Sequence, residues 1–167
     1  MQKSILVPAC ISSIRIAVLP LWFYLYNSGN IVLCLAVFAA AAFTDLIDGF
    51  LARRLKGSTR FGAYYDAATD FAFVIGIFTF FSLKGFYPVW LLLLITVSFA
   101  QFIASSVYAK KLHDPIGRFT GSALYIGVVL TLVIPSKATF SFVEYAFFGF
   151  FLLSLASRAV SFAKKPA

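Results

Sequence analysis

The stretch Thr44–Asp70, TDLIDGFLARRLKGSTRFGAYYDAATD, contains four of the six acidic residues of the whole chain. These four residues are Asp45, Asp48, Asp66 and Asp70, and each stands in otherwise apolar sequence. Carboxylates inside a membrane are costly, and they are rarely kept there without a partner or a function. The spacing of these four residues is therefore the main clue to how the chain folds around them and to what it does.

The composition of the 167-residue chain indicates an integral membrane protein. Hydrophobic residues make up 62% of it and charged residues only 12%, whereas a soluble domain has roughly 45–50% apolar and about 25% charged residues. The length predicts a single domain over residues 1–167. The net charge of +8 comes from basic residues in short loops, which indicates topology and contact with anionic lipid or phosphate. We therefore expect no nucleic-acid partner.

Six apolar segments approach the roughly 20 residues that a helix needs to span a bilayer. Residues that favour turns separate them, including Asn27-Ser28-Gly29-Asn30 and Gly57-Ser58. This pattern predicts an all-α integral membrane protein with six transmembrane helices. The predicted helices are Ile5–Tyr26, Ile31–Leu51, Phe61–Leu83, Val89–Tyr108, Phe119–Ile134 and Phe140–Phe162.

Basic residues gather in every second connection and at the C-terminal end, whereas the other connections carry at most one lysine each. Basic loops stay in the cytoplasm, so both termini and the turn at 53–60 are predicted to face it. Aromatic residues near the opposite ends of the helices, among them Trp22, Tyr24 and Tyr87, are predicted to lie at the other membrane interface.

The four carboxylates are spaced so that two pairs form on neighbouring helices. Asp45 and Asp48 are three residues apart and Asp66 and Asp70 are four apart, so each pair shares a helix face. The link between the two helices is short and turns at Gly57, so the helices must be antiparallel. Counting from Gly57 sets Asp48 level with Asp66 and Asp45 level with Asp70, about 13 and 19 Å from the turn. The cluster is thus predicted to lie just inside the cytoplasmic leaflet.

Four carboxylates this close together need cations to balance their charge. A set of oxygen ligands with no histidine or cysteine nearby favours Mg²⁺ or Mn²⁺ over zinc. Such a site can hold two ions, which suits phosphoryl chemistry. Gly49 and Gly62 leave room for a ligand to approach the backbone, and Arg53 is placed to contact a phosphate through two parallel hydrogen bonds.

Three other interpretations of the acidic residues are open. Arginines could neutralise them in a purely structural network, or they could line a path in a non-enzymatic divalent cation transporter or a proton pathway. An intramembrane prenyltransferase also uses aspartates and magnesium, but it needs a second acidic motif. Only Asp114 and Glu144 remain beyond Asp70.

Written as a pattern, the stretch is Asp45-x2-Asp48-Gly49-x2-Ala52-Arg53-x8-Gly62-x3-Asp66-x3-Asp70. It resembles the signature of the CDP-alcohol phosphatidyltransferase family at all eight fixed positions. The six-helix outline is similar to that family as well, so the resemblance covers most of the chain, although only this stretch is specific.

The resemblance implies an enzyme that transfers a phosphatidyl or related lipid-phosphate group from a CDP-linked lipid to an alcohol and releases CMP. It implies metal binding by Asp45, Asp48, Asp66 and Asp70, with Asp70 also acting as the general base. The residues implied to line the CDP site are Gly49, Ala52, Arg53 and Gly62. The resemblance also implies a homodimer in the bilayer, with the active site facing the cytoplasm.

Two further arginines bear on the acceptor alcohol. Arg118 begins the fifth predicted helix and Arg158 lies near the end of the sixth, both toward the cytoplasm. They suggest an acceptor that itself carries phosphate, such as glycerol 3-phosphate or inositol phosphate; the alternatives are interfacial anchors or salt bridges to aspartates. The segment RIAVLP, which begins at Arg15, resembles the first helix of phosphatidylglycerophosphate synthases. The stretch Asp66–Phe71 departs from their usual Asp-Pro-x-Ala-Asp-Lys.

Overall fold

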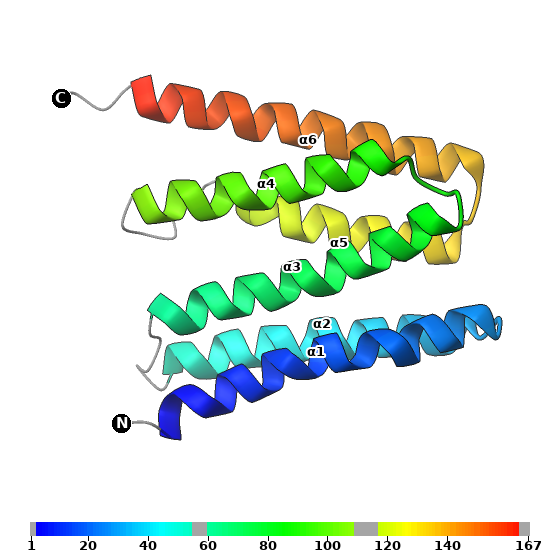
Figure 1. The fold of residues 1–167 in the computed structure, drawn as a ribbon, viewed down its shortest axis with the longest axis horizontal. Coiled ribbons are helices and arrows are strands. Elements are labelled where there is room, and N and C mark those ends of the chain that lie inside the picture. The colour runs from blue at the N-terminus through cyan, green and yellow to red at the C-terminus, as the bar shows by residue number, and fades with distance from the viewer. Residues whose placement is uncertain (1–2, 55–59, 109–116, 164–167) are drawn as a thin grey trace. The chain divides into compact units, whose positions relative to one another are not determined.

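The computed structural model describes residues 3–54, 60–108 and 117–163. Within these ranges, the side chains of residues 3–13, 45–54, 60–61, 63, 105–108, 117–118 and 158–163 are outside the description. Every regular element of the described chain is an α-helix (Figure 1). The helices are α1 (Lys3–Asn27), α2 (Ile31–Arg54), α3 (Arg60–Leu83), α4 (Val89–Tyr108), α5 (Gly117–Val133) and α6 (Lys137–Ala163).

The prediction of six helices is confirmed, because each predicted apolar segment coincides with one helix. By length and composition, two described stretches could cross a membrane: Tyr64–Leu83 and Lys137–Ser157. Three further apolar helical stretches, each of 10–17 described residues, are Ile31–Thr44, Val89–Ala104 and Phe119–Val133. The all-helical, apolar character agrees with a membrane protein, while the number of spans and the side that the termini face stay predictions.

The chain divides into two compact units, Met1–Ile77 and Phe78–Ala167. Helix α3 contributes its first part to the first unit and its last turns to the second. The first unit therefore holds α1, α2 and the acidic part of α3, whereas the second holds α4, α5 and α6.

In the first unit, α1 packs along α2 (Figure 1). The indole Nε1 of Trp22 donates a hydrogen bond of 3.2 Å to the carbonyl oxygen of Cys34, and both residues are fully buried. Phe38 of α2 stacks on Phe73 of α3, with ring centroids 5.9 Å apart. Trp22 was predicted to lie at the membrane interface. It is a buried core residue of this unit, where a backbone carbonyl satisfies its N–H, and its depth in the membrane stays a prediction.

In the second unit, α5 packs against α6, and α4 contacts both. Tyr87, also predicted for the interface, is buried, and its hydroxyl lies 2.5 Å from Thr131 Oγ1. Thr131 Oγ1 donates to the carbonyl of Gly127 at 2.7 Å, so Tyr87 is the donor to Thr131. Burial raises the pKa of Tyr87 above its ordinary value of 10.0, and the charge of Glu144 adds to this shift. Satisfied hydrogen bonding accounts for both buried aromatic residues.

A glycine in the left-handed backbone conformation, Gly85, follows the end of α3. Gly85 has a φ of 79°, a conformation that residues with a Cβ rarely adopt. Its N–H donates to the Ser82 carbonyl at 2.9 Å, and the N–H of Phe86 donates to the Phe81 carbonyl at 3.0 Å. These paired bonds satisfy carbonyls that the helix end would otherwise leave open. Gly29, with a φ of 77°, lies in the same position after α1.

We expect Gly85→Ala to lower the free energy of unfolding by about 1 kcal/mol, because alanine is strained at positive φ. Thermal unfolding of the purified protein in detergent measures this as a fall in Tm of about 2–4 °C. Gly121→Ala is the matched control, since a Cβ there meets no atom within 4 Å and the backbone is helical. An equal fall in both variants would contradict the assigned role of Gly85.

Candidate functional site

Two of the predicted metal ligands, Asp66 and Asp70, lie one helical turn apart on α3. Their side chains are 36% and 27% exposed, so both carboxylates are accessible from outside the helix packing. Between them, Thr69 is buried, and its hydroxyl donates to the carbonyl of Asp66 at 2.8 Å. The hydroxyl is thus bonded to its own helix. The structure confirms that Asp66 and Asp70 share one face of α3, because both contact the same partner atom.

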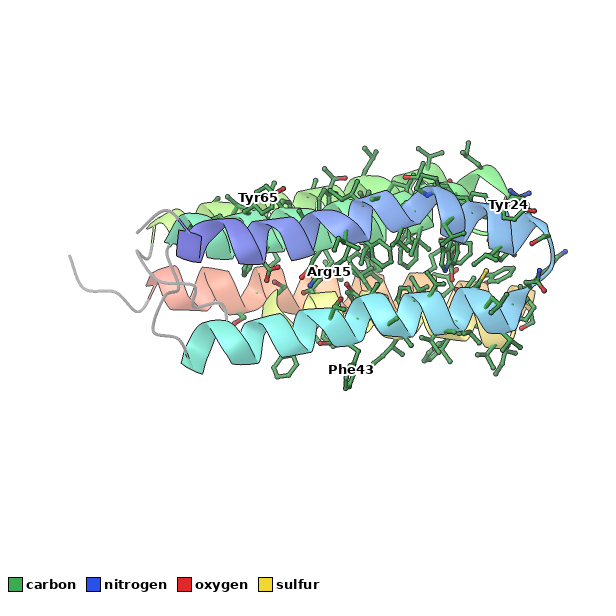
Figure 2. All side chains as sticks on the ribbon, turned by 90° about the horizontal axis from the view of Figure 1, so that it is seen from below. Arg15, Tyr24, Phe43 and Tyr65 are labelled. Atoms are coloured by element: carbon green, nitrogen blue, oxygen red, sulfur yellow. The ribbon has the colours of Figure 1, made fainter. Side chains whose placement is uncertain are left out.

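That partner is Arg15, near the middle of α1. Its side chain is 1% exposed, and its Nη1 forms an ion pair with Asp70 Oδ1 and lies 3.5 Å from Asp66 Oδ1. Figure 2 shows Arg15 pointing from α1 into the first unit, whereas Phe43 of α2 points away from it. A buried guanidinium thus bridges the two carboxylates.

Sequence reasoning did not assign Arg15 to the site. The signal was present, because an arginine in the middle of an apolar helix needs an anionic partner. The flanking residues Ile14 and Ile16 are 57% and 42% exposed, so Arg15 alone of the three turns inward. One of the alternative interpretations was that arginines neutralise the acidic residues in a structural network. The contacts of Arg15 agree with it for Asp66 and Asp70.

Gly62, predicted to line the CDP site, lies in α3 one turn before Asp66 and is half-buried. The other predicted site residues belong to helices, but their side chains are outside the described residues. They are Asp45, Asp48, Gly49, Ala52 and Arg53 of α2, Arg118 of α5 and Arg158 of α6. The alignment of the two carboxylate pairs along the helices and the phosphate contacts of the arginines therefore stay predictions.

The described carboxylates fit a hard divalent cation. Asp66 and Asp70 offer oxygen donors one turn apart, and both are partly exposed, which is the donor chemistry that Mg²⁺ and Mn²⁺ prefer. Among residues with described side chains, no three His, Cys, Asp or Glu side chains gather. A larger ligand set depends on Asp45 and Asp48, whose side chains lie outside the described residues.

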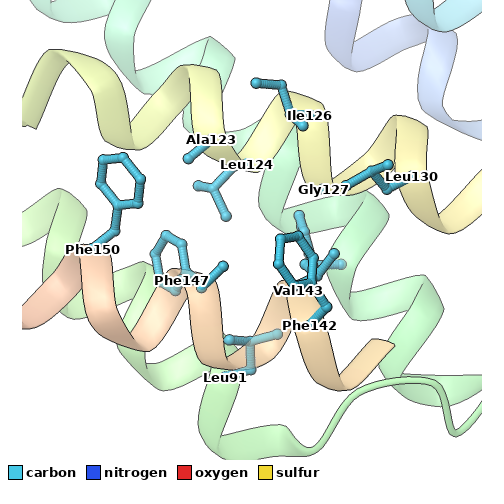
Figure 3. A pocket seen from close by; sticks show the side chains of 12 residues that line it. Leu91, Ala123, Leu124, Ile126, Gly127, Leu130, Phe142, Val143, Phe147 and Phe150 are labelled. Carbon is cyan, nitrogen blue, oxygen red and sulfur yellow. The ribbon is translucent and has the colours of Figure 1, made fainter. Parts of the chain in front are cut away.

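An apolar cavity of about 160 Å³ lies within the second unit (Figure 3). Residues of α5 and α6 form most of its lining, including Leu124, Gly127, Val143 and Phe147. It contains none of the predicted site residues and no charged side chain. It therefore offers no group for acid–base or phosphate chemistry.

Comparison with known proteins points to one family. The sequence profile described as CDP-alcohol phosphatidyltransferase matches residues 5–159. A protein of Pectobacterium atrosepticum named CDP-diacylglycerol--glycerol-3-phosphate 3-phosphatidyltransferase is 34% identical over 132 residues, which cover 75% of this chain and 70% of that protein. Proteins of the same name from Sodalis glossinidius and Yersinia enterocolitica are each 33% identical over 132 residues, which again cover 75% of this chain and 70% of each protein. No solved structure matches the chain.

The matched residues 5–159 include nearly all of α1, the whole of α2 to α5 and most of α6. They include the eight-residue signature of α2 and α3 and the Arg15 contact to it. The resemblance predicted from that signature is confirmed: the chain belongs to the CDP-alcohol phosphatidyltransferase family.

Proposed function

We propose that the protein transfers the phosphatidyl group of CDP-diacylglycerol to glycerol 3-phosphate and releases CMP. The reaction class follows from the family, and the named relatives support both the lipid donor and the acceptor. One structural observation carries the assignment to a site: Asp66 and Asp70, the last two positions of the signature, lie together on α3 and are accessible.

The roles of the acidic residues follow from their chemistry. The acceptor hydroxyl oxygen forms a bond to the lipid-side phosphorus, and the bond from that phosphorus to the oxygen of CMP breaks. Asp70 accepts the proton that the hydroxyl loses, as a general base. We assign Asp45, Asp48 and Asp66 as metal ligands, together with Asp70, for two ions of Mg²⁺ or Mn²⁺. Divalent cations held there supply positive charge beside the diphosphate.

The remaining signature residues bind the nucleotide end of the donor. Arg53 offers a guanidinium that can form two parallel hydrogen bonds to the diphosphate. Gly49, Ala52 and Gly62 have small or absent side chains, so the CDP group can approach the helix backbones closely. These contacts orient the lipid-side phosphorus toward the acceptor hydroxyl.

Arg118 and Arg158 are our candidates for binding the phosphate of the acceptor. Both are cationic residues near a helix terminus: Arg118 lies at the beginning of α5 and Arg158 near the end of α6. Arginine binds phosphate through paired N–H groups, and glycerol 3-phosphate carries such a group. The names of the relatives favour glycerol 3-phosphate over inositol phosphate.

We place all six helices in the bilayer, with both termini and the active site on the cytoplasmic side. Basic loops stay on the cytoplasmic side of a membrane. The basic connection at 53–60 joins the two helices that carry the signature, so the signature lies near that side. There the nucleotide stays in water while the acyl chains stay in lipid. A homodimer and a single functional domain over residues 1–167 belong to the same proposal.

A panel of acceptors tests the function. Purified protein is incubated with CDP-diacylglycerol, Mg²⁺ and one alcohol at a time, and CMP release is measured. We expect glycerol 3-phosphate to give at least about tenfold more CMP than inositol phosphate, glycerol or serine. CMP release with glycerol 3-phosphate no higher than with no acceptor would contradict the proposal.

The same preparation separates the enzyme from a cation transporter. We expect CDP-diacylglycerol with Mg²⁺ to raise the Tm by several degrees, because a ligand that binds only the folded state stabilises it. Mg²⁺ alone is the control. If CDP-diacylglycerol adds nothing to the effect of Mg²⁺, the donor does not bind and a transporter becomes the better explanation.

A further inference from the structure

Arg15 is the most deeply buried charged group among the described side chains. It lies near the middle of α1 at 1% exposure, between two exposed isoleucines. A buried charge is strongly unfavourable unless an opposite charge and hydrogen bonds compensate it. The position of Arg15 therefore depends on the carboxylates that it contacts.

One nitrogen atom makes both contacts. Nη1 of Arg15 pairs with Oδ1 of Asp70 and lies 3.5 Å from Oδ1 of Asp66. A cation that bridges two carboxylate oxygens occupies the kind of position that a bridging metal ion needs. The guanidinium carries one positive charge against two carboxylates, whereas a divalent ion carries two. A divalent ion is thus the better counter-charge for this pair.

The packing of α1 against α3 holds Arg15 at this level. Leu19, one turn after Arg15, fills the space beside Gly76 of α3, so that a Cβ added at Gly76 would lie 2.9 Å from Leu19 Cδ1. Leu19 therefore contacts α3 shortly after Asp70, and this apolar contact adds to the ion pair in joining α1 to α3.

We propose that Arg15 is an internal counter-cation, which neutralises Asp66 and Asp70 in the metal-free protein and competes with the divalent ion for their oxygens. This inference rests on the proposed function, because it takes Asp66 and Asp70 as metal ligands. Arg15 then sets the metal affinity of the site. It also keeps the first unit folded when no metal is bound, since two neighbouring carboxylates without a cation repel each other.

Mn²⁺ binding tests the competition directly. Free Mn²⁺ is measured by electron paramagnetic resonance during titration of the full-length protein in detergent, without substrate. We expect Arg15→Gln to lower the Kd for Mn²⁺ by about tenfold, because no ion pair has to be broken. Lys84→Gln is the matched control: it also removes one positive charge, but from an exposed residue at the end of α3, and its Kd should stay within twofold of wild type.

Stability gives a second measurement. The metal-free Tm of Arg15→Gln is expected to fall by at least about 4 °C, and saturating Mn²⁺ should close most of that gap. If Arg15→Gln does not fold, Arg15→Lys serves instead. Its ammonium group cannot reproduce the planar fork of the guanidinium, so the Kd should fall by about threefold.

An unchanged or higher Kd for Mn²⁺ in the Arg15 variants would overturn the proposal. If Asp66 and Asp70 do not bind metal at all, the titration gives a different result. In that case wild-type protein binds no Mn²⁺, or Asp66→Asn binds it as tightly as wild type does. The two failures are therefore distinguishable in one titration series.

Discussion

Asp70→Asn is expected to lower the rate of CMP release by at least about 1,000-fold at saturating substrates. Asparagine has nearly the same shape as aspartate but cannot accept the hydroxyl proton. Asp70 lies on α3 at 27% exposure, so the amide fits the same space, and the buried Arg15 keeps Asp66 as an anionic partner. The variant should therefore fold and still be stabilised by CDP-diacylglycerol with Mg²⁺.

Two measurements separate this loss from unfolding. Thermal protection by CDP-diacylglycerol reports donor binding, and the rate of CMP release reports turnover. Glu144→Gln is the control, because it makes the same carboxylate-to-amide change in α6 outside the proposed site. Undiminished CMP release by Asp70→Asn would refute the assignment of Asp70 as the general base.

Asp66→Asn has the second large expected effect, on metal dependence. A neutral amide oxygen is a weaker ligand for a hard divalent ion than a carboxylate is. We expect the Kd for Mn²⁺ to rise by at least tenfold and the rate at low Mn²⁺ to fall by about 100-fold. Raising the Mn²⁺ concentration should restore part of the activity, as it cannot for Asp70→Asn.

The comparison of the two variants assigns the roles. More metal compensates for the loss of a metal ligand, but it cannot replace the general base, which is the additional role proposed for Asp70. If Mn²⁺ restores neither variant or both equally, Asp66 and Asp70 do not have the distinct roles that we propose.

The helices could be predicted from the sequence because their signals are local. Apolar runs bounded by residues such as Gly29 and Gly85 mark helix ends, and both glycines have the positive φ that such ends use. The pairing of Asp66 with Asp70 follows from helix geometry alone. Each of these features depends on residues close together in the chain.

The contacts of Arg15 could not be predicted in the same way. They join residues 51 and 55 positions apart, and they depend on how α1 packs against α3. The burial of Trp22 and Tyr87 could not be predicted for the same reason. It depends on their hydrogen-bond partners, Cys34 of α2 and Thr131 of α5, which only the packing of the helices brings close.

The stoichiometry of the reaction tests the central claim most directly. Purified protein is given CDP-diacylglycerol, glycerol 3-phosphate and Mg²⁺, and CMP and the lipid product are measured together. We predict one phosphatidylglycerophosphate for each CMP, and neither product when glycerol 3-phosphate or Mg²⁺ is omitted. CMP release that continues without glycerol 3-phosphate, or without a matching lipid product, would contradict phosphatidyl transfer by this protein.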